Sequence, residues 1–204
     1  MTQTIARLFD RLPDAERAVD ALESLGVPAE DISIVGHTSG QAPARLYGEH
    51  DSAGESVAKD AETGAAIGGT LGAAGGVLAG VALIVTPGLG PLVAAGWLAA
   101  AIGTAVAGAV AGAGAGVVVG LTTAGVHRDE AELMAEGVRR GGAIVSARVE
   151  DALFAQAEAA LSEVGHVDLA ARGAAYRGAG WVFDENAPPY SDEDIDRERA
   201  RLAP

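Results

Sequence analysis

The chain has 204 residues, a formal net charge of −14 at pH 7 and no cysteine. This length allows one or two domains with a buried core. The negative charge disfavours nucleic-acid binding, and the lack of cysteine excludes disulfides, thiolate nucleophiles and cysteine-based metal sites. The opening residues, MTQTIARLFDR, contain no apolar stretch behind a basic start, so no cleaved secretory signal is expected.

Residues 1–36 are predicted to form the first half of an α+β domain, as a strand, a helix and a second strand. Thr4–Asp10 has strand-like alternation. From Pro13, alanine, valine and leucine recur at helical spacing until Gly26, which is a natural stop. Asp31–Gly36, with the sequence DISIVG, reads as the second strand.

Residues 37–62 are predicted to be a linker because they mix Ser, Gly, Pro and charges without periodicity. The following stretch, Thr63–His127, contains no Asp, Glu, Lys or Arg. We interpret it as an α-helical hairpin that turns at Pro87, Gly88, Gly90 and Pro91.

Small residues recur every fourth position along both predicted arms, which is typical of a glycine zipper. Glycine lowers helix stability in water by about 1 kcal/mol relative to alanine, so its frequency needs a compensating reason. Close backbone packing between helices is such a reason. The predicted helix-packing interface consists of Gly64, Gly68, Gly72, Gly76, Gly80, Gly96, Gly108, Gly112, Gly116 and Gly120.

Residues 128–177 are predicted to supply a charged return helix and the second half of the domain. HRDEAELMAEGVRRGG reads as the return helix, Ala143–Val149 as a strand, Ala152–Val164 as a helix and His166–Ala175 as a last strand. Two strand-helix-strand units in tandem predict a ferredoxin-like fold, with the apolar hairpin inserted between its second and third strands.

Residues 178–204 form an acidic, proline-containing tail. Ser191 and Asp194 resemble a capping box, which favours a short terminal helix. Aromatic residues gathered in this region favour docking on the same or a neighbouring subunit, although a disordered tail is an equal alternative.

The arrangement resembles the bacterial general-stress-protein and low-temperature-induced-protein family. The matching phrases are ARLFDRLPDAERAVDALESLGVPAEDISIVG, the glycine-rich apolar insertion and HRDEAELMAEGVRRGGAIVSARV, within residues 4–175. The resemblance implies a stress-responsive role, a ferredoxin-like domain and association with a membrane or with other copies. It brings no catalytic residues.

No motif predicts an enzyme, a cofactor or a metal. His37, His50, His127 and His166 have no second ligand at metal-site spacing. The glycines around Gly114 lie inside an apolar arm rather than after a strand, so they do not predict a dinucleotide loop.

The first functional hypothesis is a non-enzymatic, stress-associated protein that multimerises through the hairpin at or in the cytoplasmic membrane, with membrane lipid as a partner and the acidic domain in the cytoplasm. As a helix, Thr63–Thr86 would be about 36 Å long, enough for a bilayer. Pro91–Val126 would span about 54 Å, which is too long for one crossing.

The second hypothesis is a soluble cytoplasmic homo-oligomer in which the hairpins bury one another. The overlong second arm and the modest hydrophobicity favour it. A third hypothesis, a small-ligand sensor, has no polar cluster to support it.

Overall fold

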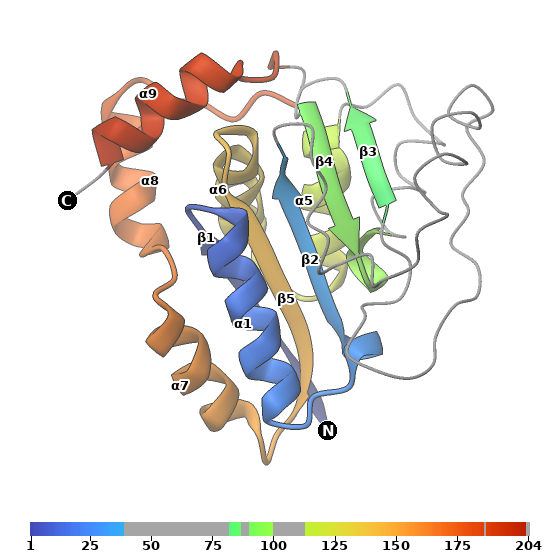
Figure 1. Cartoon of the computed structure of the whole chain (residues 1–204). Coiled ribbons are helices and arrows are strands. Elements are labelled where there is room, and N and C mark those ends of the chain that lie inside the picture. Colours follow the sequence, from blue (N-terminus) through green and yellow to red (C-terminus); the bar gives the residue numbers. More distant parts are fainter. Residues whose placement is uncertain (39–81, 87–89, 100–112, 186, 203–204) are drawn as a thin grey trace.

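The computed structural model describes residues 1–38, 82–86, 90–99, 113–185 and 187–202. They form a mixed α+β domain around a five-stranded antiparallel sheet with helices on both faces (Figure 1). The strand order is β1-β5-β2-β4-β3. The strands are β1 (Thr2–Phe9), β2 (Ile32–His37), β3 (Ala82–Thr86), β4 (Gly90–Ala95) and β5 (Ala143–Glu150).

The predicted strand-helix-strand unit at the start of the chain is confirmed. Helix α1 (Leu12–Ser24) has Pro13 in its first turn, where a backbone N–H would have no partner within the helix. Gly26 follows the helix with φ of +86°. The helix carries the chain from β1 to β2, and β5 lies between these two strands.

Each face of the sheet has its own hydrophobic core, because successive strand residues point to opposite sides. On one face, Ile5 and Phe9 of β1 pack with residues of α1 and α7 (Phe154–Val164). On the other face, Leu8 packs with residues of α5 (Ala113–Thr123) and α6 (Arg128–Arg139). Both faces are covered, which explains why all six residues of β2 are buried.

A purely helical hairpin was predicted for residues 63–127. This prediction is wrong for the described residues on either side of the predicted turn, because they form strands. β3 and β4 are strands that pair with each other, and β4 also pairs with β2. The sequence ALIVT in β3 contains β-branched residues that suit a strand, and the sheet supplies the hydrogen-bond partners. The predicted helical character is confirmed in α5. Residues 63–81 and 100–112 lie outside the described residues.

The predicted last strand, His166–Ala175, is also wrong, because α8 (Leu169–Gly178) occupies most of it. Asp168 caps this helix by accepting a hydrogen bond from the Ala171 N–H at 3.0 Å. Just before the helix, the Val167 N–H donates to the Leu8 carbonyl of β1 at 2.8 Å. The sequence LAARGAAYRG is rich in helix formers, which outweigh its weak alternation.

The predicted terminal helix is confirmed as α9 (Asp192–Leu202). Its capping box is complete: the Ser191 Oγ accepts from the Asp194 N–H, and the Asp194 Oδ2 accepts from the Ser191 N–H, both at 3.2 Å. Figure 1 shows α9 beyond the end of the sheet at which β2 ends. The tail therefore docks on its own domain rather than extending into solvent.

Candidate functional site

The predicted helix-packing glycines fall into three groups. Gly116 and Gly120 lie on α5, and both are buried. Gly96 is not helical, because it directly follows β4 with φ of +81°. The remaining glycines of the predicted interface lie outside the described residues: Gly64, Gly68, Gly72, Gly76, Gly80, Gly108 and Gly112.

The predicted hairpin turn is described only at its second end. Gly90 and Pro91 belong to β4, where they are paired with Thr86 and Val85 of β3. The antiparallel pairing means that the chain reverses between the two strands. Pro87 and Gly88 lie outside the described residues.

Gly96 has a different role from helix packing, since it lets the chain after β4 approach the backbone of β2. A Cβ on this residue would lie 2.2 Å from the carbonyl oxygen of Ile32. Directly beside it, the buried Ser33 hydroxyl donates to the Ala95 carbonyl at 2.7 Å and accepts from the Leu98 N–H at 3.1 Å. Gly96 and Ser33 thus fix the end of β4 to the domain.

A cluster of arginine, glutamate and tyrosine side chains joins α6, α8 and α9. Glu136 of α6 lies one turn before Arg139, the last residue of the helix, and Arg140, its C-cap residue, so the three side chains can meet. Arg139 donates to both carboxylate oxygens of Glu136, at 2.7 and 2.6 Å, and the Arg140 Nε donates to the Glu136 Oε1 at 2.6 Å. Glu136 is buried, so its charge needs both partners.

The same cluster continues into α9 through Glu198. The Arg140 Nη1 donates to Glu198 at 2.8 Å, and Arg201 donates to both oxygens of Glu198 at 2.9 and 2.7 Å. Burial alone would raise the pKa of Glu198, but hydrogen bonds from Arg201 and Arg140 outweigh it and hold the pKa below 4.5. Glu198 is therefore an ionised link between the two helices.

Two tyrosines contact the guanidinium groups of this cluster. The Arg140 guanidinium lies 4.0 Å from the ring centroid of Tyr176 on α8 and 5.4 Å from that of Tyr190, which precedes α9. Arg139 lies 4.6 Å from the Tyr190 ring. Burial raises the pKa of Tyr176 above 10.0, so its phenol stays neutral near pH 7. The contacts with Tyr190 add to the ion pairs that attach α9, and the contact with Tyr176 attaches α8 to the same arginine.

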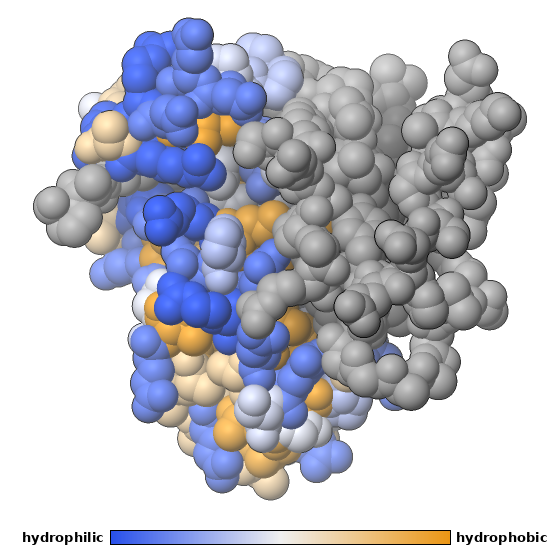
Figure 2. Space-filling model, in the orientation of Figure 1, coloured by the Kyte–Doolittle hydropathy of each residue, from blue (hydrophilic) through white to orange (hydrophobic). Residues whose placement is uncertain are grey.

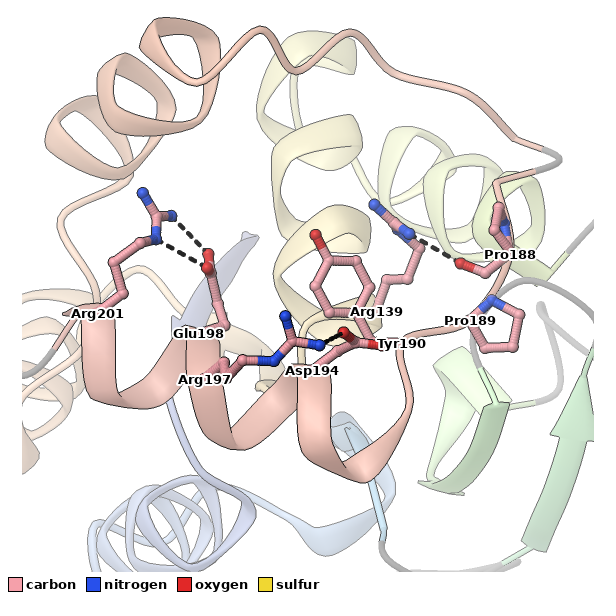
Figure 3. A pocket seen from close by; sticks show the side chains of 8 residues that line it. All are labelled: Arg139, Pro188, Pro189, Tyr190, Asp194, Arg197, Glu198 and Arg201. Atoms are coloured by element: carbon pink, nitrogen blue, oxygen red, sulfur yellow. Dashed lines mark hydrogen bonds and ion pairs between the residues drawn. The ribbon is translucent and has the colours of Figure 1, made fainter.

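A surface pocket of about 490 Å³ opens beside the cluster (Figure 3). Its arginines already have acidic or carbonyl partners: Arg139 donates to the Pro188 carbonyl, Arg201 pairs with Glu198 and Arg197 pairs with Asp194. An anion entering the pocket would have to displace these partners. The lining residues are Arg139, Pro188, Pro189, Tyr190, Asp194, Arg197, Glu198 and Arg201.

Across the part of the chain that the structure describes, no group of three or more His, Asp or Glu side chains is arranged to hold a metal ion. None of the helices in the same part has both the length and the apolar character needed to cross a bilayer.

Sequence reasoning left a docked tail and a disordered tail as equal alternatives, and it missed the cluster that attaches the tail to the domain. The usable signal was the spacing of Glu136, Arg139 and Arg140 within the return helix, which predicts mutual contacts. The contact with Glu198 joins residues 58 positions apart, so the sequence alone gives no sign of it.

Comparisons of the chain with protein-family models, with curated proteins and with solved structures found no match. The functional proposal is therefore based on the sequence and the structure of the chain itself.

Proposed function

We propose that the chain is a non-catalytic protein that assembles into homo-multimers through the uncharged segment inserted between β2 and β5. The observation that carries the proposal is the contrast between this segment, residues 63–127, and the acidic domain from which it emerges. The net charge of −14 resides outside the segment and keeps the domain in water. β4 and α5 bury their part of the segment in the domain's own core. Large apolar surfaces are rare on soluble monomers, so association with other copies is the expected way to bury the rest of this apolar sequence.

Burial in protein is better supported than burial in lipid. The last five residues of the first predicted arm form strand β3, and the second arm contributes β4 to the domain sheet. Farther along the second arm, Val117 and Leu121 of α5 join the core that includes α6. A simple two-helix membrane hairpin would leave both arms free of the domain.

The stress-associated role belongs to the same proposal and is supported by the sequence resemblance described above. A ferredoxin-like origin of the domain is supported by the order β1-β5-β2, which is that of the first three strands of such a fold. The Val167–Leu8 hydrogen bond lies on the side of β1 where a fourth strand would pair.

Detergent-free lysate separated by flotation on a density gradient, followed by light scattering of each fraction, tests the assembly proposal. We expect dense, lipid-free fractions that contain a uniform particle much larger than one chain. Material that floats with lipid and resists alkaline extraction would instead establish a membrane protein. A monomer at all concentrations would contradict self-assembly.

A matched pair of variants tests whether the glycine series drives assembly. Gly72→Leu combined with Gly112→Leu should reduce particle size, because bulky side chains hold packed helices apart. Gly40→Leu, a change of the same kind in the predicted linker, should leave the size unchanged. Equal particle sizes for the double variant and the wild type would count against the glycine zipper.

A further inference from the structure

We propose that residues 188–201 form a releasable strap that closes over the base of the insert and restrains assembly. The base consists of His37 and Thr38, where the chain leaves β2 toward the insert, and Gly141 and Gly142, which join α6 to β5. The coupling of the strap to assembly rests on the proposed function, whereas the closure of the strap stands on its own contacts.

The two sides of the base are joined in the folded domain. The His37 N–H donates to the Gly142 carbonyl at 3.1 Å, and Gly36 pairs with Ala143 in the ladder between β2 and β5. His37 and Thr38 are both buried. The stretch of chain between β2 and β5, which contains the insert and α6, therefore begins and ends at one place.

The strap seats an apolar side chain and a hydrogen-bond donor on this base. A Cβ added to Gly141 would lie 2.4 Å from the Cγ2 of Ile195, so the glycine leaves room for the isoleucine. Ile195 is only 2% exposed. One turn later, the Arg199 Nη2 donates to the Gly141 carbonyl at 3.1 Å. The strap thus contacts the returning chain directly.

The exit side of the base also responds to the strap. Burial lowers the pKa of His37, while Asp192 opposes this effect and Arg199 adds to it. Both charged residues belong to α9. His37 therefore lies within electrostatic reach of the strap, in addition to its hydrogen bond with Gly142.

Most of the attachment is polar, which makes the strap releasable. Arg140 and Glu198 connect α6 with α9, and Arg139 holds the Pro188 carbonyl at 2.8 Å. In α9 itself, only Ile195 and Glu198 are buried among residues 192–201. The α9 region is mainly hydrophilic in Figure 2. Elements with little apolar burial open locally at lower free-energy cost than the core.

Hydrogen exchange of the full-length protein tests the closure. Glu198→Gln removes the charge between Arg140 and Arg201, and Ile195→Ala removes the apolar contact with the base. Each should accelerate exchange of the α9 amides at least about tenfold, because a tenfold change corresponds to losing a contact worth about 1.4 kcal/mol. Exchange in α1 should stay unchanged, as an internal reference for the fold.

Glu193→Gln is the matched control, since it removes the same charge from an exposed position of the same helix. It should change α9 exchange less than about fivefold, as expected for an exposed acidic side chain in the first turn of a helix. Unchanged α9 exchange in both Glu198→Gln and Ile195→Ala would overturn the strap.

Light scattering of the same samples tests the link to assembly. We expect larger particles for Glu198→Gln and Ile195→Ala, because release of the strap exposes the surface that it covers beside Gly141 and makes that surface available to another copy. Faster α9 exchange without any change in particle mass would overturn this link while leaving the closure supported. A monomeric wild type would remove both the proposed function and the link, and the exchange data would still decide the closure.

Discussion

The two halves of the domain begin alike and end differently. In the first half, α1 is followed by β2, which returns to the middle of the sheet. In the second half, the chain after α7 makes one hydrogen bond to β1, from the Val167 N–H, and then forms α8 instead of a strand. Similar helices therefore do not guarantee similar continuations.

The residues after each helix explain the difference. Both helices are followed by a glycine with positive φ, Gly26 at +86° and Gly165 at +89°. ISIV in β2 then supplies β-branched side chains, which suit a strand buried on both faces. In the second half, Asp168 caps an alanine-rich segment, and cap and composition together favour a helix.

The difference also decides what can join the sheet at its two sides. On the first-half side, β2 accepts β4 of the insert. On the second-half side, the chain after α8 forms the strap against α6, and Arg172 of α8 pairs with Asp10 beyond β1. One half therefore holds the insert, and the other half supplies the segment that covers its base.

The largest expected effect comes from breaking the attachment of the insert to the first half. Gly96→Ala should lower the free energy of unfolding by about 3 kcal/mol or more, because it combines left-handed backbone strain with a clash against Ile32. Gly26→Ala and Gly165→Ala, which meet nothing within 4 Å, should each cost only about 1–2 kcal/mol. Urea unfolding measures all three, and equal losses would contradict the close approach.

A cross-strand pair of serines gives the next comparison, since Ser33 of β2 lies opposite Ser146 of β5 and both are fully buried. Ser33→Ala should cost about 1–3 kcal/mol, because it leaves the Leu98 N–H without its partner. The Ser146 hydroxyl has no hydrogen-bond partner within the described residues, so Ser146→Ala should be near neutral or stabilising. Thermal or urea unfolding that shows the opposite ranking would contradict these assignments.

The helical ending of the second half depends on its cap. Asp168→Ala should lower stability by about 1 kcal/mol, with faster hydrogen exchange in the first turn of α8. Asp168→Asn keeps a side-chain acceptor and should retain most of the stability. An alanine variant with unchanged exchange in α8 would show that tertiary packing alone maintains the helix.

The smallest expected effect is a pH dependence at the end of β2. The pKa of His37 is lowered in the folded state, so the unfolded state binds a proton first as pH falls. Stability should be fully present above about pH 6.5 and should decline below it, by at most about 1.4 kcal/mol per pH unit for one proton. His37→Asn should remove this component from stability measured by urea unfolding between pH 7.5 and pH 5.

Acid should act on the strap at lower pH than on His37. The pKa of Glu198 lies below 4.5 in the folded state, so its stabilising effect is present above pH 4.5 and is lost as pH falls through the folded pKa. Hydrogen exchange of the α9 amides should therefore become faster below pH 4.5 in the wild type but not in Glu198→Gln. This result would distinguish the effect of Glu198 from that of His37.

Periodicity predicted the elements of the domain that pack locally. β1, α1, β2, α6, β5 and α7 were all predicted because their apolar spacing, caps and breakers agree with one another. It failed at β3 and β4, where glycine and small residues fit a helix ridge as well as a strand. It also gave Gly96 the wrong role, because its contact with Ile32 joins residues far apart in the chain.

By itself, the sequence determined an acidic α+β domain, an uncharged segment within it and a terminal helix with its own capping box. Those features follow from composition and from contacts within a few residues. Only the tertiary structure decided that β4 pairs with β2 and that Glu198 reaches Arg140. The physical reason is that each of these outcomes depends on partners distant in the chain, whose hydrogen bonds and charges override weak local preferences.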